Sequence, residues 1–173
     1  MERSTAARGQ GIRRGSEFEV HEIGADELLK LPHHPRVMDL VFGDFRRKSE
    51  DDLVFLQSHF ADFLPATAVV DLGDRWGIRQ RRVRGRPFFE NPRMTADAHR
   101  LFAQALATYR TTRRIPDLLN PGNLFNETGT GRLFLVDTSV LGGTRWWPCG
   151  YWVSRFLGRV LSDTIQRWLR VGF

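Results

Sequence analysis

Cysteine and long apolar runs are what this chain of 173 residues lacks most clearly. The single cysteine, Cys149, excludes a disulfide bond within the chain and a metal site built from several thiolates. No apolar run approaches the roughly 18 residues that a membrane-spanning helix needs, and no secretory signal opens the sequence. We therefore expect a soluble protein of the cytoplasm without a transmembrane segment.

Lysine is also scarce, so that nearly every cation is an arginine. Lys30 and Lys48 are the only lysines among 26 basic residues, and the formal net charge is +6. A positive charge attracts phosphate polymers, which makes a nucleic-acid-binding module one candidate. The basic residues are nevertheless spread along the chain, and the arginines at positions 79–86 alternate between the two faces of a predicted strand. A nucleic-acid partner is therefore the weaker alternative.

The N-terminal part of the chain predicts short strands. Residues 1–10 are small and polar, which indicates a disordered tail. Apolar residues around Phe18 and Val20 follow a strand-like pattern, and residues 27–32 predict a further strand that carries Lys30 and ends at a proline. The order is therefore strand, turn and strand, with an isolated lysine on the last strand.

Helical periodicity comes next. Between residues 35 and 63, apolar residues recur every three or four positions, and Gly43 predicts a bend between two helices. Residues 66–70 and 76–85 predict two strands that complete a small antiparallel sheet. A further helix is predicted to begin at Thr95, whose hydroxyl can cap it. Because the length suits one domain, and 41% of the residues are hydrophobic, these elements can share a core.

A β-hairpin is the most informative stretch. The apolar residues 124–125 and 133–136 flank a polar turn that contains glycine, as in a hairpin. Asn123 stands before the first strand, and Asp137 follows the second. Because paired strands bring their ends together, an amide oxygen and a carboxylate could share one small volume. Hard oxygen ligands of this kind suit Mg²⁺ held against phosphates.

This hairpin and its loop resemble the catalytic centre of the protein-kinase-like fold, especially its small bacterial and aminoglycoside-phosphotransferase-like branch. The resemblance implies that Asn123 and Asp137 are metal ligands, with Asp137-Thr138-Ser139 standing where the family has Asp-Phe-Gly. The family's catalytic aspartate lies five residues before the metal asparagine, a position that is Leu118 here. Either the loop carries one extra residue and Asp117 is the catalytic base, or the base is absent.

The N-terminal strands are similar to the nucleotide-binding part of the same family. The resemblance implies that Gly15 and Ser16 form the turn over the phosphates, and that Val20 packs on adenine. Lys30 then pairs with the α- and β-phosphates. Val83, in the segment that resembles the family's hinge, joins the nucleotide site. Gly15 stands alone of the family's three loop glycines.

Several alternatives stay open at this point. Lys30 could be a solvated strand residue, and the acid that pairs with it in the family could be Asp39, Asp44 or Glu50. A basic amphipathic helix is predicted at 152–169; it could lie on a membrane surface, although packing in the core is preferred.

The resemblance as a whole implies an α+β, kinase-like fold. Residues 11–85 would form an N-terminal lobe, with a small antiparallel sheet and one or two helices. Residues 86–173 would form a reduced, mainly helical C-terminal lobe. The implied function is ATP- and Mg²⁺-dependent phosphotransfer to an unknown acceptor. The alternatives are an inactive pseudokinase scaffold and a nucleic-acid-binding module.

Overall fold

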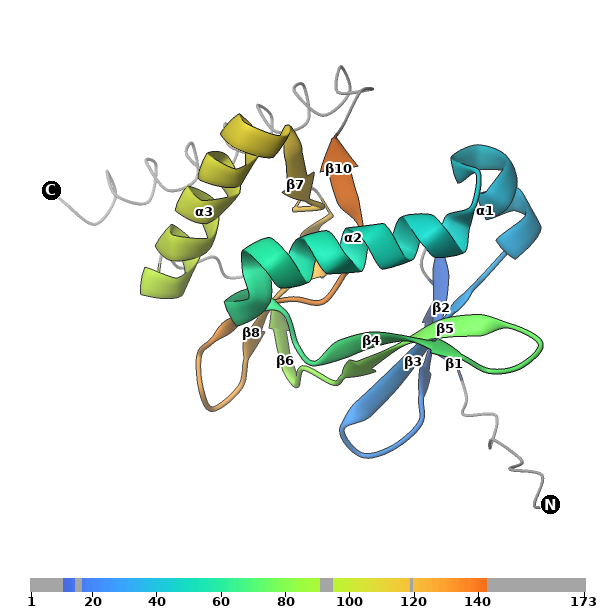
Figure 1. Ribbon diagram of the computed structural model, residues 1–173. Coiled ribbons are helices and arrows are strands. Elements are labelled where there is room, and N and C mark those ends of the chain that lie inside the picture. Colours follow the sequence, from blue (N-terminus) through green and yellow to red (C-terminus); the bar gives the residue numbers. More distant parts are fainter. Residues whose placement is uncertain (1–10, 15–16, 91–94, 119, 143–173) are drawn as a thin grey trace, which may run out of the picture.

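The computed structural model describes residues 11–14, 17–90, 95–118 and 120–142. The tail expected at 1–10, the turn residues Gly15 and Ser16, and the helix expected at 152–169 lie outside these residues. Within the described chain the fold is α+β, with small antiparallel sheets and three α-helices (Figure 1).

Five strands between residues 11 and 81 form one antiparallel sheet in the order β1-β2-β3-β5-β4. The strands are β1 (Gly11–Arg14), β2 (Phe18–Glu22), β3 (Glu27–Pro32), β4 (Thr67–Asp71) and β5 (Trp76–Arg81). Lys30 lies on the central strand β3, directly opposite Val20 of β2 and Ile78 of β5. Residues paired in this way share one face of a sheet, so Lys30 and Val20 project to the same side.

Two helices lie between β3 and β4. Helix α1 (Pro35–Phe42) ends at Gly43, whose φ of 80° breaks the helix as expected. Helix α2 (Phe45–Phe60) begins at Asp44, whose side chain accepts a 2.9 Å hydrogen bond from the Arg47 N–H. Helix α2 runs beside the sheet (Figure 1), and its first residue, Phe45, is buried together with Phe18 and Ile78.

The C-terminal lobe begins with one helix and short strands. Helix α3 (Ala96–Thr112) is capped by the Thr95 hydroxyl, which accepts from the Ala98 N–H at 3.2 Å. A three-stranded sheet joins β6 (Gly85–Pro87) to the hairpin of β8 (Leu124–Glu127) and β9 (Leu133–Leu135). A two-stranded sheet pairs β7 (Arg114–Pro116) with β10 (Val140–Gly142). Single 3-10 turns occupy Ala61–Phe63, Phe88–Glu90 and Pro121–Asn123.

The main core is shared by both lobes and holds the hairpin in place. Its fully buried members include Leu56 and Phe60 of α2, Leu101 of α3, and Leu124 and Leu133 of the hairpin. Burying each such side chain contributes roughly 1.5–3 kcal/mol. The positions of the two hairpin ends therefore depend on packing between α2, α3 and the hairpin.

The strands and helices predicted between residues 18 and 81 and the hairpin are confirmed. The mainly helical character of residues 86–173 stays a prediction, because residues 143–173 lie outside the described part, where the 17-residue helix α3 is accompanied by short strands. Strands of three or four residues carry too few positions for a periodic pattern. They form here because loop backbone groups beside the core need hydrogen-bond partners.

Candidate nucleotide and metal site

The ends of the β8–β9 hairpin bring an amide and a carboxylate into contact. Asn123 stands directly before β8, and Asp137 follows β9. The Val136 N–H donates to the Asn123 carbonyl at 2.8 Å, which holds the two ends together. The buried Asn123 side chain donates from Nδ2 to Asp137 Oδ2 at 3.0 Å and to the carbonyl oxygen of Asp117 at 2.9 Å. The Asn123 side-chain amide therefore joins three segments: the start of β8, the loop at Asp117 and the residues that follow β9.

Lys30 reaches the same place from the N-terminal sheet. Its ammonium donates to the carbonyl oxygen of Val136, the residue before Asp137. Burial lowers the pKa of Lys30, and the nearby Asp137 carboxylate acts in the opposite direction. The ammonium, the amide and the carboxylate singled out in the sequence thus meet at one site, between β3 and the hairpin. Lys30 is not a solvated strand residue, since its side chain is buried.

The loop before the hairpin distinguishes Asp117 from its neighbour. Leu118, which stands at the family's aspartate position, is 3% exposed and belongs to the main core. Asp117 is half-buried, and its N–H donates to the Ser139 carbonyl at 2.9 Å. Its backbone therefore lies beside the segment that follows Asp137. Of the two residues, only Asp117 carries a group that could accept a proton.

The structure also reveals Glu17, which the sequence analysis did not single out. Its Oε2 accepts a 3.1 Å hydrogen bond from the Ser139 hydroxyl, two positions beyond Asp137. Burial raises the pKa of Glu17; Lys48 opposes this, and Asp137 and Asp117 add to it. The only available signal was its place directly after Gly15-Ser16. A third carboxylate therefore belongs to this site.

None of the three acids proposed for Lys30 is its partner. Asp39 accepts from the Phe45 N–H at 3.1 Å, Asp44 caps α2, and Glu50 pairs with Arg46 at 3.0 Å. These local contacts satisfy each carboxylate near its own position in the chain. The acid whose charge acts on Lys30 is Asp137, from the hairpin.

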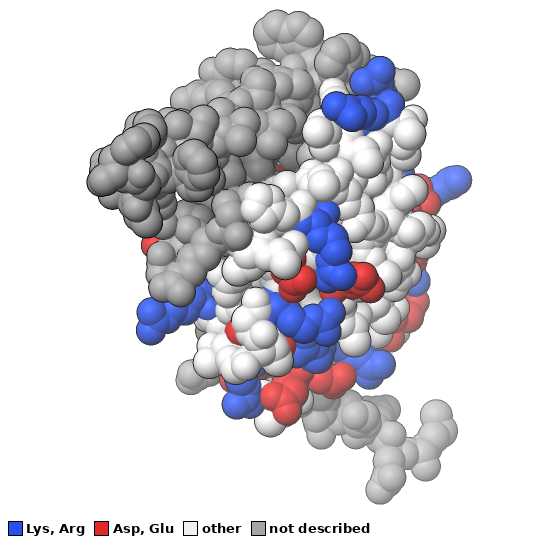
Figure 2. Space-filling model, turned by 90° about the vertical axis from the view of Figure 1, so that its left-hand side faces the viewer, with Lys and Arg blue, Asp and Glu red and all other residues white. Residues whose placement is uncertain are grey.

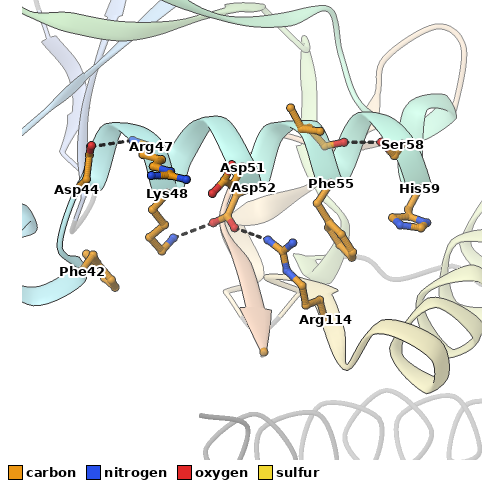
Figure 3. A pocket seen from close by; sticks show the side chains of 12 residues that line it. Phe42, Asp44, Arg47, Lys48, Asp51, Asp52, Phe55, Ser58, His59 and Arg114 are labelled. Atoms are coloured by element: carbon orange, nitrogen blue, oxygen red, sulfur yellow. Dashed lines mark hydrogen bonds and ion pairs between the residues drawn. The ribbon is translucent and has the colours of Figure 1, made fainter. Parts of the chain in front are cut away.

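The buried acid of α2 is Asp52, whose carboxylate is bonded to other groups than Lys30. It accepts from Lys48 Nζ at 2.7 Å and Arg114 Nη2 at 2.8 Å (Figure 3), and from the Val140 N–H at 3.2 Å. These bonds attach α2 to β7 and β10. Lys48, Asp52 and Arg114 also line a groove of about 690 Å³ along α2. Neither this groove nor a second hollow of about 490 Å³ is lined by Lys30, Asn123 or Asp137.

Of the four remaining residues predicted to bind the nucleotide, the structure describes two. Val20 shares a sheet face with Lys30, as described above, and is half-buried. Val83 is half-buried in the connection between β5 and β6. Gly15 and Ser16 lie outside the described residues. Their roles in nucleotide binding remain predictions.

The residues present fit a magnesium ion held together with phosphates. Asn123 and Asp137 supply two oxygen-bearing side chains at one point, and Lys30 supplies a positive charge beside them. No group of three or more histidine, cysteine, aspartate or glutamate residues able to hold a metal occurs in the described part of the chain. Mg²⁺ typically uses one or two carboxylates and completes its shell with water and substrate phosphates. The site therefore suits a metal that arrives with a nucleotide.

Three of the five arginines at 79–86 are paired with acidic residues. Arg81 pairs with Glu127 at 2.6 Å, and Arg82 with Glu22 at 2.6 Å. Arg84 pairs with Asp26 at 2.9 Å. On the face shown in Figure 2, basic and acidic side chains are interspersed. This pattern gives little support to a nucleic-acid interface, which needs unpaired basic groups on one surface.

Among the helices that the structure describes, none has the length and apolar character needed to cross a membrane.

Comparison with solved structures finds distant likenesses to this chain. No family model and no curated protein matches the chain. A co-crystal structure of WbdD and the kinase inhibitor LY294002 is similar, with a TM-score of 0.48 and 14% sequence identity. The match covers 83% of this chain but 35% of that one, so the chain spans about a third of its length.

Proposed function

We propose that the chain is an ATP- and Mg²⁺-dependent phosphotransferase of the kinase-like type, acting on an acceptor hydroxyl of unknown identity. The observation that carries the proposal is the meeting of Lys30 with Asn123 and Asp137. The lysine ammonium contacts the carbonyl next to Asp137, while the Asn123 Nδ2 donates to Asp137 Oδ2 at 3.0 Å. A cation from one lobe and two oxygen ligands from the other are what a metal-bound triphosphate requires.

Each residue then has a defined task. Lys30 would hold the phosphates as a point charge, and its pKa, lowered by burial, would rise again beside an anion. Asp137 would present its carboxylate to the metal, and Asn123 its amide oxygen. Bound Mg²⁺ would neutralise charge on the phosphates. Val20 and Val83 would contact the adenine ring, as the sequence resemblance implies.

Asp117 would act on the acceptor. As the acceptor oxygen bonds to the γ-phosphorus and the bond to ADP breaks, the Asp117 carboxylate would take the hydroxyl proton. Its neighbour Leu118 is buried in the core and has no such capacity. The catalytic base would then be Asp117, in a loop that has one residue more than the family pattern.

A pseudokinase scaffold is the second candidate, and a specific observation favours it. Glu17 places a further carboxylate at Ser139, two residues beyond Asp137, where its negative charge would disfavour phosphates. A thermal-shift titration with ATP, with and without Mg²⁺, separates the two functions. We expect a rise in melting temperature that requires both components, because a ligand that binds the folded state stabilises it. No shift with either component would favour the scaffold.

A further inference from the structure

The groove along α2 presents apolar side chains to solvent. It has a volume of about 690 Å³ and extends from Phe42, at the end of α1, to His59, in the last turn of α2 (Figure 3). Val54 lines the groove and is 60% exposed, and Phe42 is 41% exposed. Because removing apolar surface from water is favourable, the groove suits a partner that is itself apolar on one side.

The charged side chains of the groove are matched among themselves. Three acids and three arginine or lysine residues line it: Asp44, Asp51, Asp52, Arg47, Lys48 and Arg114. Asp52 accepts hydrogen bonds from both Lys48 and Arg114. The Arg114 guanidinium also lies 4.4 Å from the centre of the Phe55 ring. The lining therefore carries no excess positive charge that would attract a phosphate or a nucleic acid.

The described part of the chain ends at this same groove. Gly142, its last residue, lines the groove and pairs with Arg114 between β10 and β7. The sequence continues through residues 143–173, which lie outside the described part. Residues 143–151 can span at most about 30 Å, whereas α2, with its 16 residues, is about 24 Å long. The chain after 151 can therefore start at either end of the groove.

Residues 152–169 have the sequence pattern of a partner for this groove. One set of apolar residues recurs at spacings of three, four and seven: Leu157, Val160, Leu161 and Trp168. A polar set recurs in the same way on the opposite side of a helix: Arg155, Arg159, Ser162 and Gln166. A helix over 152–169 would be about 27 Å long, which is close to the length of α2.

We propose that residues 152–169 form an amphipathic helix that docks in the α2 groove, with the side of Leu157 against Val54 and the arginine side towards solvent. The helix would bury the apolar lining and would hold α2 against β7 and β10 from outside. The inference is independent of the proposed function, because neither Lys30 nor the predicted metal ligands line the groove.

Thiol labelling of the full chain tests whether Val54 is covered. In a Cys149→Ser background, Val54→Cys places a single thiol in the groove. Leu40→Cys is the matched reference, since Leu40 is 86% exposed on α1 and does not line the groove. We expect a maleimide to label the thiol of Val54→Cys about tenfold more slowly than that of Leu40→Cys, because labelling then waits for local opening. Equal rates would overturn the inference.

Substitutions on the segment show what covers the thiol. Leu157→Asp, added to Val54→Cys, should raise the labelling rate to that of Leu40→Cys. Ser162→Asp introduces the same charge on the polar side and should leave labelling slow. If circular dichroism shows that Leu157→Asp does not fold, Leu157→Ala replaces it, with a smaller rise expected. Slow labelling that persists in the folded Leu157 variant would overturn the inference, because another segment would then cover Val54.

Two other arrangements give distinct results, and either would overturn the inference. Slow labelling found only at high protein concentration, together with a dimer in sedimentation, would assign the groove to a second copy of the chain. Fast labelling of Val54→Cys, together with cosedimentation of the chain with vesicles of phosphatidylserine and phosphatidylcholine, would assign residues 152–169 to a membrane surface. Slow labelling of a monomer at every concentration supports docking within one chain.

Discussion

Asn123 Nδ2 donates a hydrogen bond to Asp137 Oδ2 over 3.0 Å, although 14 residues separate them in the chain. The same nitrogen donates to the carbonyl oxygen of Asp117. Asn123 therefore supports two other site residues as well as supplying a potential ligand. The loop at Asp117 and the predicted metal ligand Asp137 are therefore both hydrogen-bonded to the buried Asn123 amide.

Replacing this amide should cost stability. In Asn123→Leu, the Asp117 carbonyl and the Asp137 carboxylate both lose a donor in a buried setting, which we expect to cost about 1–3 kcal/mol. Urea denaturation measures the loss. Asn126→Leu, on the half-buried part of strand β8, is the control and should cost less. Equal stability of the two variants would show that the Asn123 bonds contribute nothing to the loop.

Asp52 should be important for stability without being part of the nucleotide site. Its buried carboxylate is bonded to Lys48, Arg114 and the Val140 N–H, so Asp52→Ala leaves two cations without their partner. We expect a loss of about 3 kcal/mol in the free energy of unfolding. The exposed neighbour Asp51 provides the control: Asp51→Ala should change it by no more than ~0.5 kcal/mol. Similar losses in both variants would contradict the assignment of this network.

Asp117 is expected to act in the chemical step rather than in binding. Asp117→Asn keeps the size of the side chain but cannot accept the hydroxyl proton. We predict that turnover falls by about 10²–10⁴-fold while the affinity for ATP is retained. Steady-state kinetics with the acceptor, once identified, measure the turnover. Titration with ATP measures the affinity. Unaltered turnover would mean that Asp117 is not the base.

Glu17 should make stability depend on pH in a defined direction. Burial raises its pKa in the folded protein above the usual 4.5, so the folded state keeps a proton that the unfolded chain has lost. The folded state binds more protons in this window, and stability therefore falls as the pH rises from 4.5 through the folded-state pKa. Lys48 moderates this effect, whereas Asp137 and Asp117 strengthen it.

Comparison of two variants isolates that contribution. Glu17→Gln has no proton to lose at this position, so its stability relative to wild type should increase as the pH rises from 4.5 towards 7. Melting temperatures measured across this range give the difference, with Glu22→Gln as the reference for an exposed carboxylate. A difference that is constant with pH would show that Glu17 ionises normally.

Local sequence patterns predict much of this site. The hairpin was predictable because apolar strands flank a glycine-containing turn, and their pairing brings Asn123 to Asp137. The sequence left open whether Lys30 is solvated, and the structure buries it on the central strand β3. The start of α3 at Thr95 also follows from a side chain that caps the first turn.

The contacts that no local pattern predicts join distant segments. Glu17 meets Ser139 across 122 residues, and Asp52 meets Arg114 across 62 residues. Both depend on how α2 and the N-terminal sheet pack against the C-terminal lobe. The sequence left Asp39, Asp44 and Glu50 as candidate partners of Lys30, whereas packing between distant segments places the Asp137 charge beside Lys30 and bonds Asp52 to Arg114.

The most direct test of the central claim is isothermal titration of the full chain with ATP, with and without Mg²⁺, in wild type and in Asp137→Asn. The account predicts ATP binding that depends on Mg²⁺ in the wild type, with the Mg²⁺ dependence lost when the Asp137 carboxylate becomes an amide. ATP binding with the same Mg²⁺ dependence in both proteins would contradict it, because Asp137 would then not hold the metal.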